Sequence, residues 1–203
     1  MRYELAYIEE AYLSGRSVIF DLDDTIFPEI NFLEERYRYV CKEIFYGNWE
    51  EPFHFILNEF NTQGRSYLFD KLIKRYNLAL STEDILRFFR CYDKASETPI
   101  NPYPWFSKLA SRLNKGYPLL LITNGNPSQQ RQKIANLNLM NLFPYVVCVF
   151  ANEYKGKPRV EPFEALASKV QIRHPIYIGD SAIDRAFCLA CNIEFLDVKK
   201  LII

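Results

Sequence analysis

The chain has 203 residues, of which 49% are hydrophobic, and 25 basic and 25 acidic residues give it a formal net charge of zero. This length suits one large or two small domains, and the hydrophobic content is enough for a packed core. Balanced charge without a long like-charge run gives no indication of a nucleic-acid partner. No apolar run approaches the roughly 20 residues that span a bilayer, and residues 1–10 lack a signal-peptide pattern, so we expect no membrane partner and a cytoplasmic location.

An acidic cluster follows the first apolar run of the chain. Val18-Ile19-Phe20 has the residue types of a buried strand, and Asp21-Leu22-Asp23-Asp24-Thr25 follows it directly. The strand would bring Asp21 and Asp23 to the carboxyl edge of a sheet, where open α/β folds bind their ligands. One carboxylate can attack an electrophile while the other transfers protons. A hard cation such as Mg²⁺ would relieve the repulsion between them, although the cluster alone also fits an acidic surface turn.

Three further polar clusters follow apolar runs that have strand character. They are the segments 123–125 (Thr-Asn-Gly), 155–158 (Lys-Gly-Lys-Pro) and 179–184 (Gly-Asp-Ser-Ala-Ile-Asp). Because the ends of parallel strands gather along one edge of a sheet, we expect a hydroxyl, a lysine and further carboxylates to converge on Asp21. This convergence favours a catalytic site over an acidic turn.

These four motifs, in this order, resemble those of the haloacid dehalogenase superfamily of phosphohydrolases, and the resemblance covers residues 15–28 and 100–198. The segment 21–25 is similar to the first motif of that family, Thr123 to the second, Lys157-Pro158 to the third, and the segment 179–184 to the fourth. Two positions depart from the family pattern: Pro162 comes later than the usual second proline, and Asn192 stands where a glycine commonly ends the helix. Asn tolerates the left-handed conformation that such a position needs.

The resemblance implies a Mg²⁺-dependent phosphatase that acts on a small phosphorylated metabolite. Asp21 would attack phosphorus and form an aspartyl-phosphate, while Asp23 would protonate the leaving group and then deprotonate water. The Thr123 hydroxyl, the Asn124 N–H group and Lys157 would bind the phosphoryl oxygens.

The resemblance also implies a metal site. The Asp21 carboxylate, the Asp23 carbonyl and the Asp180 carboxylate would hold Mg²⁺. Asp184 would be a further ligand, or a partner that orients water or the phosphate-binding lysine. Lys155 remains a second candidate for that lysine.

The pattern of strands and helices predicts an α/β fold: a doubly wound, Rossmann-like parallel sheet with an inserted helical unit. Apolar residues recur at helical spacing through residues 29–98, so we expect a small helical unit there and a catalytic core made of residues 1–28 and 99–203. The resemblance implies that this unit is the helical cap of the family. Within the core we expect helices at 103–115, 127–139, 161–171 and 182–191, and a last edge strand at 195–198.

Other functions use similar residues and remain open at this point. A phosphomutase of the same superfamily would need the same side chains, and a catalytically silent phosphate-binding or regulatory protein would be expected to have lost one of them. A receiver-type signalling domain would not need Asp23 or so long an insertion. For the substrate, the segment 20–29, with Phe27-Pro28-Glu29 after the acidic cluster, looks similar to capped family members that hydrolyse nucleoside 5′-monophosphates, and aromatic rings of the segment 29–98 could stack on a base. Sugar phosphates are the alternative, since most of these rings fall on apolar helix faces and fit the core of a small bundle.

Overall fold

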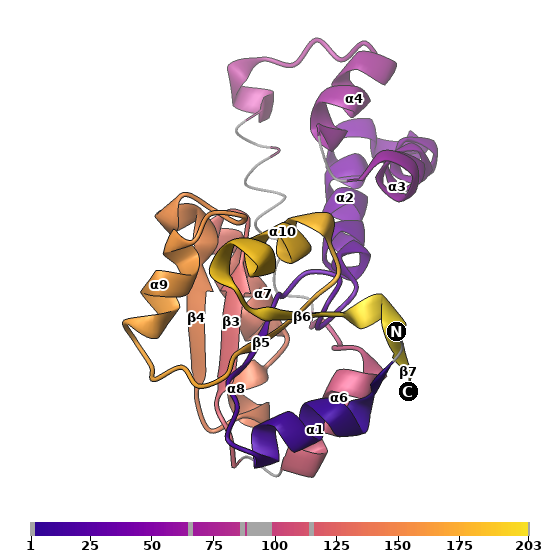
Figure 1. The fold of residues 1–203 in the computed structure, drawn as a ribbon. Coiled ribbons are helices and arrows are strands. Elements are labelled where there is room, and N and C mark those ends of the chain that lie inside the picture. The colour runs from indigo at the N-terminus through magenta and orange to yellow at the C-terminus, as the bar shows by residue number, and fades with distance from the viewer. Residues whose placement is uncertain (1–2, 65–66, 86–87, 89–98, 114–115, 203) are drawn as a thin grey trace. The chain divides into compact units, whose positions relative to one another are not determined.

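The computed structural model describes residues 3–64, 67–85, 88, 99–113 and 116–202. The chain divides into two compact units, of which the first comprises Met1–Pro28 and Ile100–Ile203 and the second comprises Glu29–Pro99 (Figure 1). The second unit is therefore inserted into the sequence of the first.

The first unit is built on a five-stranded parallel sheet with the strand order β4-β3-β2-β5-β6 (Figure 1). The strands are β2 (Val18–Phe20), β3 (Leu119–Thr123), β4 (Val146–Phe150), β5 (Ile176–Gly179) and β6 (Glu194–Asp197). From the central strand β2 the chain passes outward through β3 to β4, and it then crosses to β5 on the other side of β2. Ligands of open α/β sheets bind where the strand order reverses, which here is the carboxyl end of β2 and β5.

Helices cover both faces of this sheet. On one face, a buried cluster joins Ile19 and Tyr177 of the strands to Leu166 of α9 (Glu161–Ala167) and Phe187 of α10 (Ala182–Cys191). Successive strand residues point to opposite faces, and Phe20 accordingly packs against other helices.

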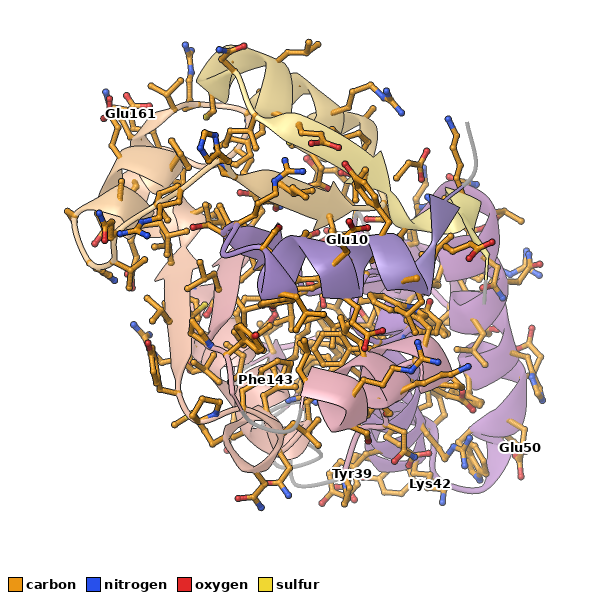
Figure 2. All side chains as sticks on the ribbon, turned by 60° about the horizontal axis from the view of Figure 1, so that its bottom comes forward. Glu10, Tyr39, Lys42, Glu50, Phe143 and Glu161 are labelled. Atoms are coloured by element: carbon orange, nitrogen blue, oxygen red, sulfur yellow. The ribbon has the colours of Figure 1, made fainter. Side chains whose placement is uncertain are left out.

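The opposite face is covered by α1 (Leu5–Leu13) and α6 (Pro104–Leu113), which contact each other. The Phe20 ring lies 5.7 Å from the ring of Phe106 on α6, and Phe143 lies 5.7 Å from the same ring. Figure 2 shows this side of the unit, with Glu10 on the exposed side of α1 and Phe143 among the buried side chains. The central strands β2, β3 and β5 are thus buried on both faces, as their continuous apolar sequences require.

Two of the predicted helices end earlier than expected. The helix predicted at 127–139 is two helices, α7 (Pro127–Asn136) and α8 (Leu139–Leu142), because Asn138 between them adopts a left-handed conformation with φ of 53°. The predicted helix 161–171 ends at Ala167. The helix 182–191 has the predicted bounds, and Asn192 ends it with φ of 54°.

Short elements complete the first unit. They are the 3₁₀ helices η3 (Ala151–Tyr154) and η4 (Val198–Lys200) and the strands β1 (Tyr3–Glu4) and β7 (Leu201–Ile202). β1 and β7 pair in parallel, so segments near both ends of the chain lie side by side. Sequence patterns predicted neither this pairing nor α1.

The second unit contains α2 (Glu29–Phe45), η1 (Tyr46–Asn48), α3 (Glu50–Gln63) and α4 (Leu68–Arg75). The residues with predicted helical spacing that are buried include Leu33, Tyr37, Val40, Phe53, Ile56, Leu68 and Leu72. The Ser81 hydroxyl accepts a hydrogen bond from the Asp84 N–H group at 3.1 Å, which is the contact of a residue that caps the start of a helix. Phe89 and Tyr92, which extend the predicted pattern, lie outside the described residues.

Within the described part of the chain, none of the helices combines the length and the apolar character that crossing a membrane requires.

Candidate active site

Asp21 and Asp180 leave neighbouring strands at the same edge of the sheet. Asp21 directly follows β2 and Asp180 directly follows β5, and these strands pair in register, with Phe20 opposite Ile178. The Asp21 N–H group donates to the Ile178 carbonyl at 2.9 Å, which extends the strand ladder to the acidic residue itself. The carboxyl ends of the two strands at the switch point therefore deliver two carboxylates to one place.

Lys157 lies between two of the predicted site carboxylates. Its Nζ atom is 2.9 Å from Asp21 Oδ1 and 2.6 Å from Asp184 Oδ1, and all three side chains are buried or nearly so. Burial raises the pKa of Asp21 to about 7, with the nearby Asp184 and Asp23 charges adding to the rise and Lys157 opposing it. Burial favours the neutral amine of Lys157, but the two carboxylates outweigh it and raise the pKa of this lysine.

Both oxygens of Asp184 already have partners. Oδ1 accepts hydrogen bonds from Lys157 and from the Tyr177 hydroxyl, whereas Oδ2 accepts from the N–H and hydroxyl groups of Ser181. The Ser181 hydroxyl in turn accepts from the Asp184 N–H group, which makes a capping box at the start of α10. Burial acts to raise the pKa of Asp184, but Lys157 and the Ser181 hydrogen bonds hold it below its ordinary value.

Gly179 leaves the space that the Asp184 side chain occupies. A Cβ atom on Gly179 would lie 2.7 Å from Asp184 Cγ, a distance that real Cβ contacts essentially never show. Only glycine at the end of β5 leaves room for this carboxylate, which explains the pairing of glycine with a later aspartate in the fourth motif.

Asn124 holds the backbone of Lys157 through its side chain. Its Nδ2 atom donates to the Lys157 carbonyl at 3.2 Å, and its Oδ1 atom accepts from the Lys157 N–H group at 2.8 Å. We had expected a role only for the Asn124 backbone, so this side-chain contact was missed. The alternative lysine, Lys155, points elsewhere: it is exposed and pairs with Glu161 at 2.6 Å.

Asp23 and Thr123 meet two residues of α7 that sequence reasoning missed. The Gln130 Nε2 atom lies 2.8 Å from Asp23 Oδ2 and 2.7 Å from Thr123 Oγ1, and the Lys133 Nζ atom lies 2.6 Å from Asp23 Oδ1. Gln130, Lys133 and Leu137 are all buried on one face of the segment. The sequence signal that could have revealed them is a glutamine and a lysine at positions where helical spacing predicts apolar residues.

The carboxylates of Asp21, Asp180 and Asp184 form a group that could hold a metal ion, since ligand atoms from all three lie within 4.8 Å of one another. Among the described residues, the buried Asp21 Oδ1 atom forms an ion pair with Lys157 at 2.9 Å but has no hydrogen-bond partner. A hard cation would satisfy this oxygen, so the donor set fits Mg²⁺.

The Asp180 carboxylate has a lysine partner and lies beside a cavity. Lys199 donates to Asp180 Oδ2 at 3.0 Å and to the Asp180 carbonyl at 2.8 Å, which holds the carboxylate in place. A cavity of about 380 Å³ lies beside it, lined by residues that include Asp24, Tyr103 and Trp105. This cavity leaves space for a ligand next to the Asp180 carboxylate.

Comparison with known proteins identifies the family. Residues 18–198 match the sequence model of the haloacid dehalogenase-like hydrolase family, and the chain belongs to that family. It is 26% identical over 200 residues to the glyceraldehyde 3-phosphate phosphatase of Methanocaldococcus jannaschii, with 92% of this chain and 85% of that protein covered.

Solved structures share the fold. A HAD-superfamily hydrolase of subfamily IA from Geobacter sulfurreducens superposes with a TM-score of 0.63 at 19% identity, covering 90% of this chain and 86% of that one. The HAD-hydrolase YfnB from Bacillus subtilis, solved with bound magnesium, gives a TM-score of 0.57 at 20% identity, covering 89% and 86%. The family, the phosphohydrolase class and the doubly wound α/β fold predicted from the sequence are therefore confirmed.

Proposed function

We propose that this protein is a Mg²⁺-dependent phosphatase that hydrolyses a small phosphomonoester through a covalent intermediate on Asp21. The observation that carries the proposal is the buried Asp21 carboxylate, with Lys157 at 2.9 Å and a second carboxylate, Asp23, two residues later. A nucleophile, a fixed positive charge and a proton-transfer group stand at one edge of the sheet.

In this mechanism the ionised Asp21 carboxylate attacks phosphorus in line with the leaving oxygen. Lys157 and the Thr123 hydroxyl face the phosphoryl oxygens and stabilise the charge that develops on them. Asp23 gives its proton to the departing alkoxide, and it then takes a proton from the water that cleaves the aspartyl-phosphate.

The metal would be held by the Asp21 and Asp180 carboxylates and the Asp23 carbonyl, where it supplies positive charge to the phosphoryl oxygens. The Asp21 Oδ1 atom, which has no hydrogen-bond partner among the described residues, supports this assignment, as does the magnesium bound to a protein of the same fold. Since both oxygens of Asp184 have partners on the chain, its role in the proposal is to orient Lys157 rather than to bind the metal.

For the substrate we propose a small sugar or triose phosphate. Support comes from the relatives named glyceraldehyde 3-phosphate phosphatase, of which the protein from Methanocaldococcus jannaschii matches 92% of this chain. The expectation of a nucleotide depended on the resemblance of the segment 20–29 to nucleotide-hydrolysing family members and on aromatic rings in the segment 29–98. Tyr37 and Phe53 are buried in the second unit, which favours a packing role for these rings over base stacking. We propose that this unit acts as a cap.

The test is a measurement of free phosphate released from glyceraldehyde 3-phosphate, other sugar phosphates and nucleoside 5′-monophosphates, with Mg²⁺ and with a chelator. We expect metal-dependent release and the highest kcat/KM for a small sugar phosphate. Asp21→Asn keeps the shape of the side chain and should abolish turnover. A variant that retained much of the wild-type rate would contradict the covalent mechanism, and a tenfold preference for nucleotides would contradict the substrate class.

A further inference from the structure

Both oxygens of the Asp23 carboxylate are held by one helix. Oδ2 accepts a hydrogen bond from Gln130 Nε2 at 2.8 Å, and Oδ1 accepts one from Lys133 Nζ at 2.6 Å. A single donor would leave the carboxylate free to turn about its last side-chain bond. Two donors, one on each oxygen, fix the plane of the group as well as its position.

The two donors are rigidly placed. They lie one turn apart on α7, and both side chains are buried, with 1% of each residue exposed. The helix begins at a fixed point because the Asn126 side chain accepts from the Ser128 and Gln129 N–H groups, with Pro127 in the first turn.

The orientation of the Gln130 amide follows from its neighbours. Its terminal atom is within hydrogen-bond distance of the Asp23 carboxylate, the Asn124 carbonyl at 2.9 Å and the Thr123 hydroxyl. A backbone carbonyl can only accept, so the Gln130 group that faces the Asn124 carbonyl must be the NH₂ group. Gln130 therefore connects the proton-transfer group to the proposed phosphate-binding threonine.

Packing alone does not explain these residues. Lysine is almost never fully buried unless it is paired, and apolar residues of similar volume in place of a buried ion pair are often neutral or stabilising. The Lys133 Nζ atom lies 5.9 Å from the centroid of the Phe27 ring, so an aromatic ring is also close to this buried charge. A buried glutamine and lysine both directed at one carboxylate indicate a functional use.

We infer that Gln130 and Lys133 are positioning residues that hold the Asp23 carboxylate in the orientation needed for proton transfer. The inference rests on the proposed phosphatase function and adds two residues to it. In the first step a P–O bond breaks, an Asp21–phosphorus bond forms and the Asp23 proton moves to the leaving oxygen. In the second step water attacks phosphorus, the Asp21–phosphorus bond breaks and the water proton moves to Asp23.

The test uses 4-nitrophenyl phosphate, because 4-nitrophenolate leaves without needing a proton and only the second step then depends on Asp23. For Lys133→Met we expect the pre-steady-state burst of nitrophenolate to stay within about threefold of wild type, while the steady-state rate falls about 10- to 100-fold. With an alkyl phosphate both steps should slow. Lys108→Met, on the exposed side of α6, is the matched control and should behave as wild type.

A double-mutant cycle distinguishes positioning from an independent role. If Lys133 acts only through Asp23, then Lys133→Met should have little further effect in an Asp23→Asn background. Effects that multiply would overturn the inference, as would an equal loss of burst and steady-state rates in a folded Lys133→Met protein.

A second variant covers the case in which Lys133→Met fails to fold by circular dichroism. Gln130→Leu should then show the same separation of burst and steady-state rates, with Gln129→Leu as its half-exposed control. A Gln130→Leu protein indistinguishable from the control would contradict the inference. The outcomes separate the two proposals. A wild-type protein that releases no phosphate would contradict both the phosphatase function and the positioning role. An active wild-type protein with unaffected variants would contradict only the positioning role.

Discussion

The Lys157 ammonium group donates a hydrogen bond of 2.6 Å to Asp184 Oδ1, and the second oxygen of the same carboxylate closes the capping box at the start of α10. One side chain thus connects the lysine of the third motif to the helix of the fourth. The position of the lysine beside Asp21 therefore depends on a helix terminus.

Asp184→Asn should weaken both the active site and the fold. The asparagine NH₂ group would face either Lys157 or the Ser181 N–H group, and in each case two donors would meet. We expect the free energy of unfolding to fall by about 1–3 kcal/mol and kcat/KM to fall about 10- to 100-fold. Urea unfolding and phosphate release would measure these effects. Glu10→Gln on the exposed side of α1 is the control, and an equally small effect of both variants would contradict the role of Asp184.

Gly179→Ala should displace Asp184 although it changes no polar group. The added Cβ atom would lie 2.7 Å from Asp184 Cγ, and overpacking of this kind costs about 1–3 kcal/mol. We expect a lower midpoint of urea unfolding together with reduced activity. Gly47→Ala is the matched control, since among the described residues no heavy atom beyond its chain neighbours lies within 4 Å of its Cβ position. Wild-type activity in Gly179→Ala would show that the site tolerates a displaced Asp184.

The stabilisation given by Mg²⁺ should increase with pH. The pKa of Asp21 is raised to about 7 in the folded metal-free protein from an ordinary value of 3.8, chiefly by burial. Between these values the folded state binds more protons than the unfolded state, so this group lowers stability as pH rises. A bound cation removes that cost by favouring the ionised form.

Thermal unfolding with and without Mg²⁺ would measure this effect. We expect a larger increase in Tm at about pH 8 than at about pH 5, where protonated Asp21 competes with the metal. Asp21→Asn should lose most of this pH dependence. An Mg²⁺ effect that is the same at both pH values would contradict the assignment of Asp21 as a ligand.

The phosphoryl group should be transferred to water, which makes the protein a hydrolase rather than a mutase. A phosphomutase would use the same side chains but return the phosphoryl group to a sugar. Phosphorus NMR of a reaction with a sugar phosphate should show inorganic phosphate in amounts equal to the substrate consumed, without any bisphosphate activator. Positional isomers of the sugar phosphate with little free phosphate would instead identify a mutase.

Much of the fold and most of the candidate site could be predicted from the sequence, because the signals are local. The apolar run at Val18–Phe20 and the acidic residues after it are adjacent in the chain, and parallel strands necessarily place their carboxyl ends together. The position of Asp21, Lys157 and Asp180 at one edge follows from these facts. The family resemblance depended on the same short segments.

The tertiary structure alone decided which side chains support that site. Lys133 lies 110 residues from Asp23 in the chain, and the hydrogen bond between Tyr177 and the Ile122 carbonyl joins two separate strands. Such contacts depend on which face of a helix or strand is turned inward and on the packing of β2, β3 and α7 together. Helical spacing showed a glutamine and a lysine among apolar positions, but it carries no information about the carboxylate that meets them, because that partner comes from another part of the chain.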